Sequence, residues 1–312
     1  MASDPEHWTD AADRSVARGR STGYPVGDFV VRTWRCLEYS SLYLGLVAAT
    51  EVLVVTFLLS LPLSPAPVVV ALVTFAVYAN DRLVDLETDD VSNPRRTAFV
   101  RRHREVLYVA AAIAYGVGAA LSALGGPLAF GLALLPGAVW FVYAVDWIPV
   151  PSADVSRLKE VPVVSSVLVA VAWSLAVVML PLAFANAPLT PAAGLTLLYF
   201  ALAAFVSVQV ANVHDIPGDV DNGIVTLPTV LGVDRIRTVL YAITLGTGAM
   251  LAVAAVRGLY TVTAAAVLSL GVLGLAVVVA GLGRTGRGTT LTLAAECTRI
   301  PVFAAFAVLT YL

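Results

Sequence analysis

Charged residues are scarce in this chain, and their scarcity decides its class. Only 13% of its 312 residues are charged and 59% are hydrophobic. A soluble domain is about a quarter charged and about half apolar. The mean hydropathy is +0.87. Together these values exclude a soluble globular protein and predict a polytopic membrane protein.

Cysteine and lysine are also rare, and several sequence patterns are absent. Cys36 and Cys297 are the two cysteines, and both fall near the predicted cytoplasmic face, so we expect free thiols. Strands of alternating apolar and polar residues are missing, which excludes a membrane barrel. No cleavable signal peptide is visible, because the first apolar run is too long and follows a polar arm.

Long apolar runs are what the sequence does contain. A helix needs about 20 residues to cross the hydrocarbon core. The run that ends the chain is the weakest, because its cleanest part, residues 300–312, is short. We predict an all-α protein with nine transmembrane helices near residues 38–60, 66–84, 106–124, 127–147, 161–186, 190–213, 236–256, 259–282 and 290–312. Residues 1–24 are expected to form a disordered cytoplasmic arm, and residues 25–312 the transmembrane domain.

Basic residues are distributed unevenly along this topology. Apart from Arg257, the arginines and the single lysine, Lys159, fall in the N-terminal arm, in loops on the same side or in the first turns of the spans that follow these loops. The positive-inside rule then places the N-terminus in the cytoplasm. With nine spans the C-terminus lies outside. Nearly all acidic residues share the cytoplasmic side, so the polar chemistry is expected there.

Two acidic clusters end otherwise apolar runs. Asp81 and Asp85 are four residues apart, as are Asp215 and Asp219. On a helix such pairs lie one turn apart, and two charges about 5 Å apart at an effective dielectric of about 20 repel by roughly 3 kcal/mol. A divalent cation reverses that repulsion, and oxygen ligands favour Mg²⁺ over zinc. We predict a magnesium site held by Asp81, Asp85, Asp89, Asp215 and Asp219.

The residues after the second cluster carry a more specific signal. Asp215 and Asp219 are followed by Gly223 and then by Thr-Leu-Pro at 226–228. This stretch resembles the second aspartate motif of the UbiA superfamily of intramembrane prenyltransferases. Asn212, three residues before Asp215, is similar to the form found in some members that act in quinone pathways.

The first cluster resembles the other motif of that family, with one departure. Asn80-Asp81 is followed by two further aspartates and then by Arg96-Thr97. The family usually has two residues between Asn-Asp and the next aspartate, but residues 82–84 make three here. Either Asp81 takes the place of the usual asparagine, or the helix end is adjusted locally. Arg82 is unusual beside metal ligands, and we expect it to pair with one of them.

The resemblance spans nearly the whole chain and implies a function. It implies helices around a central cavity, and Mg²⁺-dependent transfer of an isoprenyl group from a prenyl diphosphate to a lipophilic acceptor within the membrane. Acceptors of relatives include quinone precursors, ether lipids, carotenoids and tetrapyrroles. Partners would be the two substrates and membrane lipid, with no nucleic acid. The implied catalytic residues are Asp81, Asp85, Asp215 and Asp219, and the expected diphosphate contacts are Asn80, Arg96, Tyr143, Arg157, Lys159 and Asn212.

Two other readings stay open. A cation-coupled transporter would also use intramembrane acids, although transporter sites usually lie near the midplane on broken helices. A prenyltransferase-like protein that only binds lipid is the other alternative. Glu51 is a separate case, since a carboxylate in the middle of a span is costly. It is either protonated, exposed to the cavity, or paired with a neighbouring asparagine or tyrosine.

Overall fold

The computed structural model describes residues 25–144 and 163–311, and every regular element in these ranges is a helix. The predicted all-α fold is confirmed. The chain divides into two compact units, residues 1–38 and residues 39–312. The first unit contains all of α2 (Pro25–Tyr39) except its last residue. The predicted arm, residues 1–24, lies outside the described residues.

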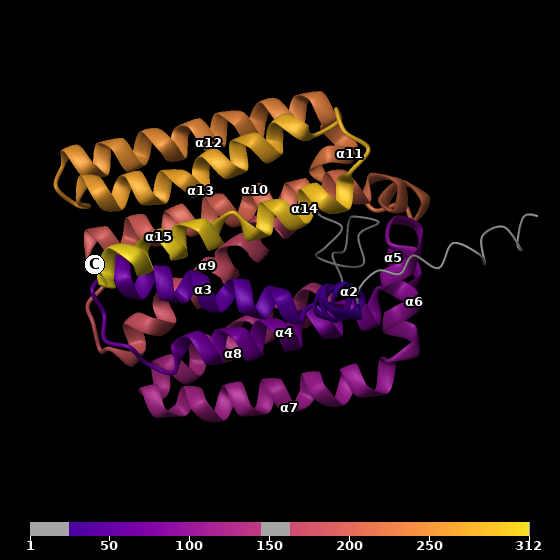
Figure 1. Ribbon diagram of the computed structural model, residues 1–312, viewed down its shortest axis with the longest axis horizontal. Coiled ribbons are helices and arrows are strands. Elements are labelled where there is room, and N and C mark those ends of the chain that lie inside the picture. Colours follow the sequence, from indigo (N-terminus) through magenta and orange to yellow (C-terminus); the bar gives the residue numbers. More distant parts are fainter. Residues whose placement is uncertain (1–24, 145–162, 312) are drawn as a thin grey trace, which may run out of the picture. The chain divides into compact units, whose positions relative to one another are not determined.

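The second unit is a bundle whose long helices run side by side (Figure 1). Three short helices, α5 (Leu86–Ser92), α6 (Pro94–Arg102) and α11 (Leu227–Leu231), lie at the end of the bundle opposite the C-terminus. The long helices are α3 (Leu42–Leu58), α4 (Ala66–Val84), α7 (Arg104–Ser122), α8 (Gly126–Ala144), α9 (Val164–Phe184), α10 (Pro191–Asp221), α12 (Val233–Val256), α13 (Val262–Gly281) and the consecutive pair α14 (Gly288–Cys297) and α15 (Arg299–Tyr311).

The number of membrane spans is close to the prediction of nine without confirming it. Among the described residues, seven helices are long and apolar enough to cross a membrane, or eight if Phe29–Tyr39 and Leu42–Leu58 are counted together as one broken span. One of the seven, Arg104–Phe141, contains α7 and most of α8. A 3₁₀ turn, η2 (Ala123–Gly125), separates these two helices, and they pack against each other.

Helix α10 is longer than expected. We predicted its end near residue 213, but the helix continues to Asp221 and passes through Pro217. It starts at a strong signal, because Pro191 occupies the first turn and the Thr190 hydroxyl accepts a hydrogen bond from the Ala193 N–H. Its 31 residues extend about 46 Å at 1.5 Å per residue, well beyond a hydrocarbon core of about 30 Å. The second acidic cluster therefore lies on this helix and not after it.

The last predicted span, residues 290–312, is two helices. α14 ends at Cys297 and α15 begins at Arg299, with Thr298 between them. Pro301 explains the break, because proline has no N–H to bond the carbonyl four residues earlier and its ring clashes with that carbonyl. Cys297 is that residue, and a proline is tolerated in the first turn of the new helix.

A buried ion pair links α3 to α15. Arg299 Nε donates to Glu51 Oε1 at 2.6 Å, and Trp173 Nε1 on α9 donates to Glu51 Oε2 at 2.5 Å. Arg299 Nη1 donates to the Ser207 hydroxyl on α10 at 3.1 Å, and also bonds the Ala295 carbonyl and the Thr298 hydroxyl. Glu51 is 0% exposed and Arg299 is 3% exposed.

This network corrects the expectations for Glu51. Its partners are an arginine and a tryptophan, not an asparagine or tyrosine, and its side chain is fully buried. A desolvated carboxylate is stable only when its charge and its lone pairs are met. The pair therefore joins α3, α9, α10 and α15 at one point.

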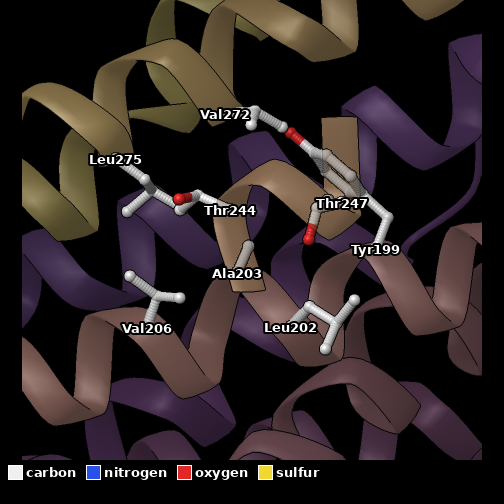
Figure 2. A pocket seen from close by; sticks show the side chains of 8 residues that line it. All are labelled: Tyr199, Leu202, Ala203, Val206, Thr244, Thr247, Val272 and Leu275. Carbon is white, nitrogen blue, oxygen red and sulfur yellow. The ribbon is translucent and has the colours of Figure 1, made fainter. Parts of the chain in front are cut away.

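A small cavity lies between α10, α12 and α13 (Figure 2). Its hydroxyl groups are already bonded to carbonyls of the bundle: Tyr199 to Leu268, Thr244 to Leu240 and Thr247 to Ile243. The remaining lining is aliphatic, from Leu202, Ala203, Val206, Val272 and Leu275. This gap in packing is apolar in character and separate from the charged groups described below.

Removing one partner of the buried pair should be costly. We expect Glu51→Ala to lower the free energy of unfolding by about 3–5 kcal/mol, because Arg299 would be left charged and unpaired. Asp234→Ala is the matched control, since the Asp234–Arg237 pair has an 88% exposed carboxylate, and its loss should cost less than about 1 kcal/mol. Thermal unfolding in detergent measures both. Equal effects for the two variants would contradict the account.

Candidate active site

The second acidic motif is presented by the last turns of α10. Asp219 is 8% exposed and its Oδ2 accepts a hydrogen bond from the Thr226 hydroxyl at 3.1 Å. Thr226 also starts α11, where its N–H donates to the Thr229 hydroxyl at 2.8 Å. The Thr-Leu-Pro segment thus has a physical role. It folds the chain back at the end of α10 and supplies a hydroxyl to one of the two aspartates.

The first acidic motif spans a helix break. α4 ends at Val84, Asp85 is the junction, and α5 starts at Leu86. Backbone bonds from Asp85 N to Asp81 O and from Asp89 N to Asp85 O continue through the junction. The backbone hydrogen bonding of the helix is thus continuous across Asp85, although α4 and α5 are separate helices.

Two aspartates of the first motif have different partners. Asp81 Oδ1 accepts a hydrogen bond from Trp140 Nε1 on α8 at 3.1 Å. Asp89 Oδ2 instead lies 2.8 Å from Arg96 Nη2, in an ion pair that is only about one-fifth exposed. The first motif thus contacts α8 through Asp81, and it forms an ion pair with Arg96 of α6 through Asp89.

The two motifs meet through Asn93, the residue between α5 and α6. Asn93 Nδ2 donates to Asp215 Oδ1 at 3.4 Å, and Asn93 Oδ1 lies 3.3 Å from His214 Nε2. α5 packs directly against α10, and Asp89 is close enough to Asp215 to repel it electrostatically. Groups that are 122 residues apart in sequence therefore form one polar site. Sequence reasoning missed Asn93, although it lies beside the Arg-Thr pair.

A second set of polar groups, from α3, α4 and α14, was also missed. The Tyr43 hydroxyl donates to Glu296 Oε2 at 2.5 Å, and Arg82 Nε donates to the Ser41 hydroxyl. Glu296 interacts electrostatically with Arg82 and Arg96, which connects this set to the acidic motifs. The sequence signal for Glu296 was a single acid within the otherwise uncharged stretch 290–298.

The residues predicted to contact the diphosphate differ in where the structure places them and in which groups they bond. Arg96 belongs to the site through Asp89. Asn80 Nδ2 bonds the Ala76 carbonyl of its own helix, and Asn212 Nδ2 lies 3.4 Å from the Ser166 hydroxyl on α9. Tyr143 lies near the end of α8, and nothing is described of its side chain. Arg157 and Lys159 lie outside the described residues.

The donor set suits magnesium bound together with a phosphate ligand. Within residues 25–144 and 163–311, no three His, Cys, Asp or Glu side chains form a group that could hold a metal ion. Mg²⁺ does not need such a cage, because it usually takes one or two carboxylates and completes its shell with substrate phosphates and water. The carboxylates of Asp89, Asp215 and Asp219 are oxygen donors of that kind.

Comparison with known proteins decides the family. The sequence profile of the UbiA prenyltransferase family matches residues 39–290. The chain belongs to the UbiA prenyltransferase family. No curated protein is similar enough in sequence to count as a match. The segment that matches the family contains both acidic motifs and the residues that join them.

Solved structures share the UbiA fold. An apo UbiA homologue from Aeropyrum pernix K1 is 16% identical with a TM-score of 0.64, and the match covers 86% of this chain and 98% of that one. A UbiA homologue from Archaeoglobus fulgidus bound to GPP and Mg²⁺ is 15% identical with a TM-score of 0.61, covering 88% and 98%. A digeranylgeranylglyceryl phosphate synthase structure is 14% identical with a TM-score of 0.55, covering 87% and 98%. With its apolar helices, this UbiA protein is a multi-pass membrane protein.

A tight contact between α14 and α10 offers a test of the site. A Cβ at Gly288 would collide with His214 Nδ1, whereas a Cβ at Gly286 would meet nothing within 4 Å. We expect Gly288→Ala to displace His214 from Asn93 and to cost about 1–3 kcal/mol of stability, while Gly286→Ala stays near wild type. Thermal unfolding in detergent compares the two. If Gly288→Ala were as stable as Gly286→Ala, the His214 placement would be wrong.

Proposed function

We propose that this UbiA protein is a Mg²⁺-dependent prenyltransferase that moves an isoprenyl group from a prenyl diphosphate to a lipophilic acceptor within the membrane. The observation that carries the proposal is the meeting of both acidic motifs at Asn93, at one end of an apolar helix bundle. Likeness to the Archaeoglobus fulgidus homologue bound to GPP and Mg²⁺ supports it. The proposed catalytic residues remain Asp81, Asp85, Asp215 and Asp219.

Each part of the site has a task in this reaction. Mg²⁺, when bound, would neutralise diphosphate oxygens and polarise the C–O bond to the prenyl C1. Asp215 and Asp219 would bind Mg²⁺ at the second motif on α10, and Asp81, Asp85 and Asp89 would bind Mg²⁺ at the first motif. Arg96, fixed by Asp89, would place a cation beside the departing diphosphate, where developing negative charge is stabilised most.

The bundle around the site would serve the prenyl chain and the acceptor. As the diphosphate leaves with the electron pair of the C–O bond, the acceptor forms a bond to C1 and releases a proton. Apolar walls would hold the isoprenoid chain and keep water from the cationic centre. We propose that the site and the N-terminus face the cytoplasm and that the C-terminus lies outside, as the distribution of basic residues predicts.

The position of the charges argues against a transporter. The acidic motifs lie at one end of the bundle, beside α5, α6 and α11 (Figure 1). The fully buried Glu51 is occupied by Arg299 and Trp173, so it offers no free carboxylate to a passing cation. An anionic headgroup held at the membrane interface fits this arrangement better than ion passage.

Diphosphate release from geranyl diphosphate tests the proposal. We expect the wild-type chain in lipid nanodiscs, with a membrane-lipid extract as acceptor source, to release diphosphate only with Mg²⁺. Asp215→Asn or Asp219→Asn should lower the rate by about 100-fold or more, because charge stabilisation at the leaving group is lost. Asp221→Asn, at an exposed position on the same helix, is the matched control.

Each alternative function predicts a different outcome of this experiment. Full turnover in both site variants would make the site assignment wrong. Binding of geranyl diphosphate without any release would favour the lipid-binding homologue. Mg²⁺ flux into sealed vesicles, without diphosphate release, would favour the transporter.

A further inference from the structure

Arg82, in the middle of the first motif, forms no ion pair with any carboxylate that the structure describes. It lies in the last turn of α4, among the three residues that separate Asp81 from Asp85. We expected it to pair with one of the acids, and this is wrong: in the described part of the chain no carboxylate lies within ion-pair distance of Arg82. The ion pairs found there are Arg96–Asp89, Arg101–Asp90, Arg237–Asp234 and Arg299–Glu51.

Arg82 is nevertheless held in position. Its Nε donates to the Ser41 hydroxyl at the start of α3, which leaves the two terminal nitrogens of the fork to face other groups. The side chain is partly exposed within the protein. An anchored guanidinium of this kind loses little conformational entropy when it binds an anion.

A second guanidinium stands nearby. Arg82 and Arg96 repel each other electrostatically, and Asp89 and Glu296 are within range of Arg82 without pairing with it. Asp89 is already engaged by Arg96, and Glu296 by Tyr43. Two cations held together in a largely apolar bundle are stable when an anion lies between or beside them.

Two buried donors in this region lack an acceptor among residues 25–144 and 163–311. They are Nε of Arg96 itself and Oγ of Ser92. Ser92 lies next to Asp215 without meeting the geometry of a hydrogen bond to it. Buried donors are nearly always satisfied in native proteins, so these two have room for an acceptor supplied by water or by a ligand. A ligand that satisfies both must carry several acceptor oxygens.

We propose that Arg82 is a diphosphate-binding residue, and that Arg82 and Arg96 together add positive charge at the first motif to that of any metal ion bound by its aspartates. The planar fork of arginine matches phosphate oxygens in a bidentate way, and Ser92 adds a hydroxyl donor. This inference rests on the proposed function and assigns the headgroup of its substrate. The consequence is measurable affinity for diphosphate when divalent metal is removed.

Equilibrium binding of inorganic pyrophosphate to the full chain tests the inference. In EDTA we expect the wild-type protein to retain binding, and Arg82→Gln to weaken it by roughly tenfold or more, the loss typical of one charge-assisted contact. Arg101→Gln is the matched control, because Arg101 is 59% exposed on α6 and lies 3.7 Å from Asp90. Wild-type affinity in Arg82→Gln, with or without Mg²⁺, overturns the inference.

Because Arg82 also tethers α4 to Ser41, its variant can lose binding through misfolding. Phenylglyoxal labelling of the wild-type chain, read by peptide mass spectrometry, avoids that problem. Pyrophosphate should slow labelling of Arg82 and Arg96 severalfold and leave Arg101 unchanged. If saturating pyrophosphate does not change the labelling rate of Arg82, the inference is overturned. Equal protection of Arg82 by inorganic phosphate or sulfate also overturns it.

Failure of the Arg82 assignment can be distinguished from failure of the proposed function. If pyrophosphate binds with Mg²⁺ while Arg82 stays unprotected, the inference fails and the proposed function stands. If pyrophosphate binds under neither condition, the proposed function fails and the inference fails with it.

Discussion

The buried ion pair between Glu51 and Arg299 is the contact on which the arrangement of the second unit depends. It joins α3 to α15 directly, and its hydrogen bonds extend to α9 through Trp173 and to α10 through Ser207. Burying two charges is expensive, and only this geometry compensates for the lost hydration. α10, which carries the second acidic motif, is therefore fixed relative to α3, α9 and α15 by a polar contact within an apolar bundle.

The active end of the bundle follows from that constraint. With α10 and the α14–α15 pair held against α3, the acidic end of α10 meets α5, and His214 meets Asn93 and Thr289. Acidic and basic side chains are then concentrated at one end, where a charged headgroup can reach them while a hydrocarbon chain stays among apolar helices. A reaction that breaks the bond between a water-soluble diphosphate and an isoprenoid chain needs this separation.

Sequence alone predicted the elements well and their contacts poorly. The helix at residues 66–84 was predicted to the residue, since its apolar run is bounded by prolines on one side and by Asp85 on the other. α10 was predicted too short, because hydropathy falls at His214 although the helix continues. The break at Thr298 could have been read from Pro301. In each of these cases the helix boundary depends on residues close to it in sequence, so it was or could have been predicted from the sequence.

The partners inside the site could not be found in this way. Tyr43 and Glu296 are 253 residues apart, and Glu51 and Arg299 are 248 apart, so no spacing rule connects them. Arg299 was read as a topology signal and Asn93 was passed over. By contrast, Asp215 and Asp219 were found because their spacing and the Thr-Leu-Pro tail are local, and the tail proved to hold the Thr226 hydroxyl that contacts Asp219.

The central claim is that both acidic motifs hold one diphosphate. Pulsed electron–nuclear double resonance of Mn²⁺, a paramagnetic substitute for Mg²⁺, tests it most directly in the presence of inorganic pyrophosphate. The account predicts a strong phosphorus coupling from a direct metal–phosphate contact, and predicts that it is lost or altered both by Asp215→Asn in the second motif and by Asp89→Asn in the first. Manganese bound without phosphorus coupling, or a coupling that either substitution leaves unchanged, would contradict it.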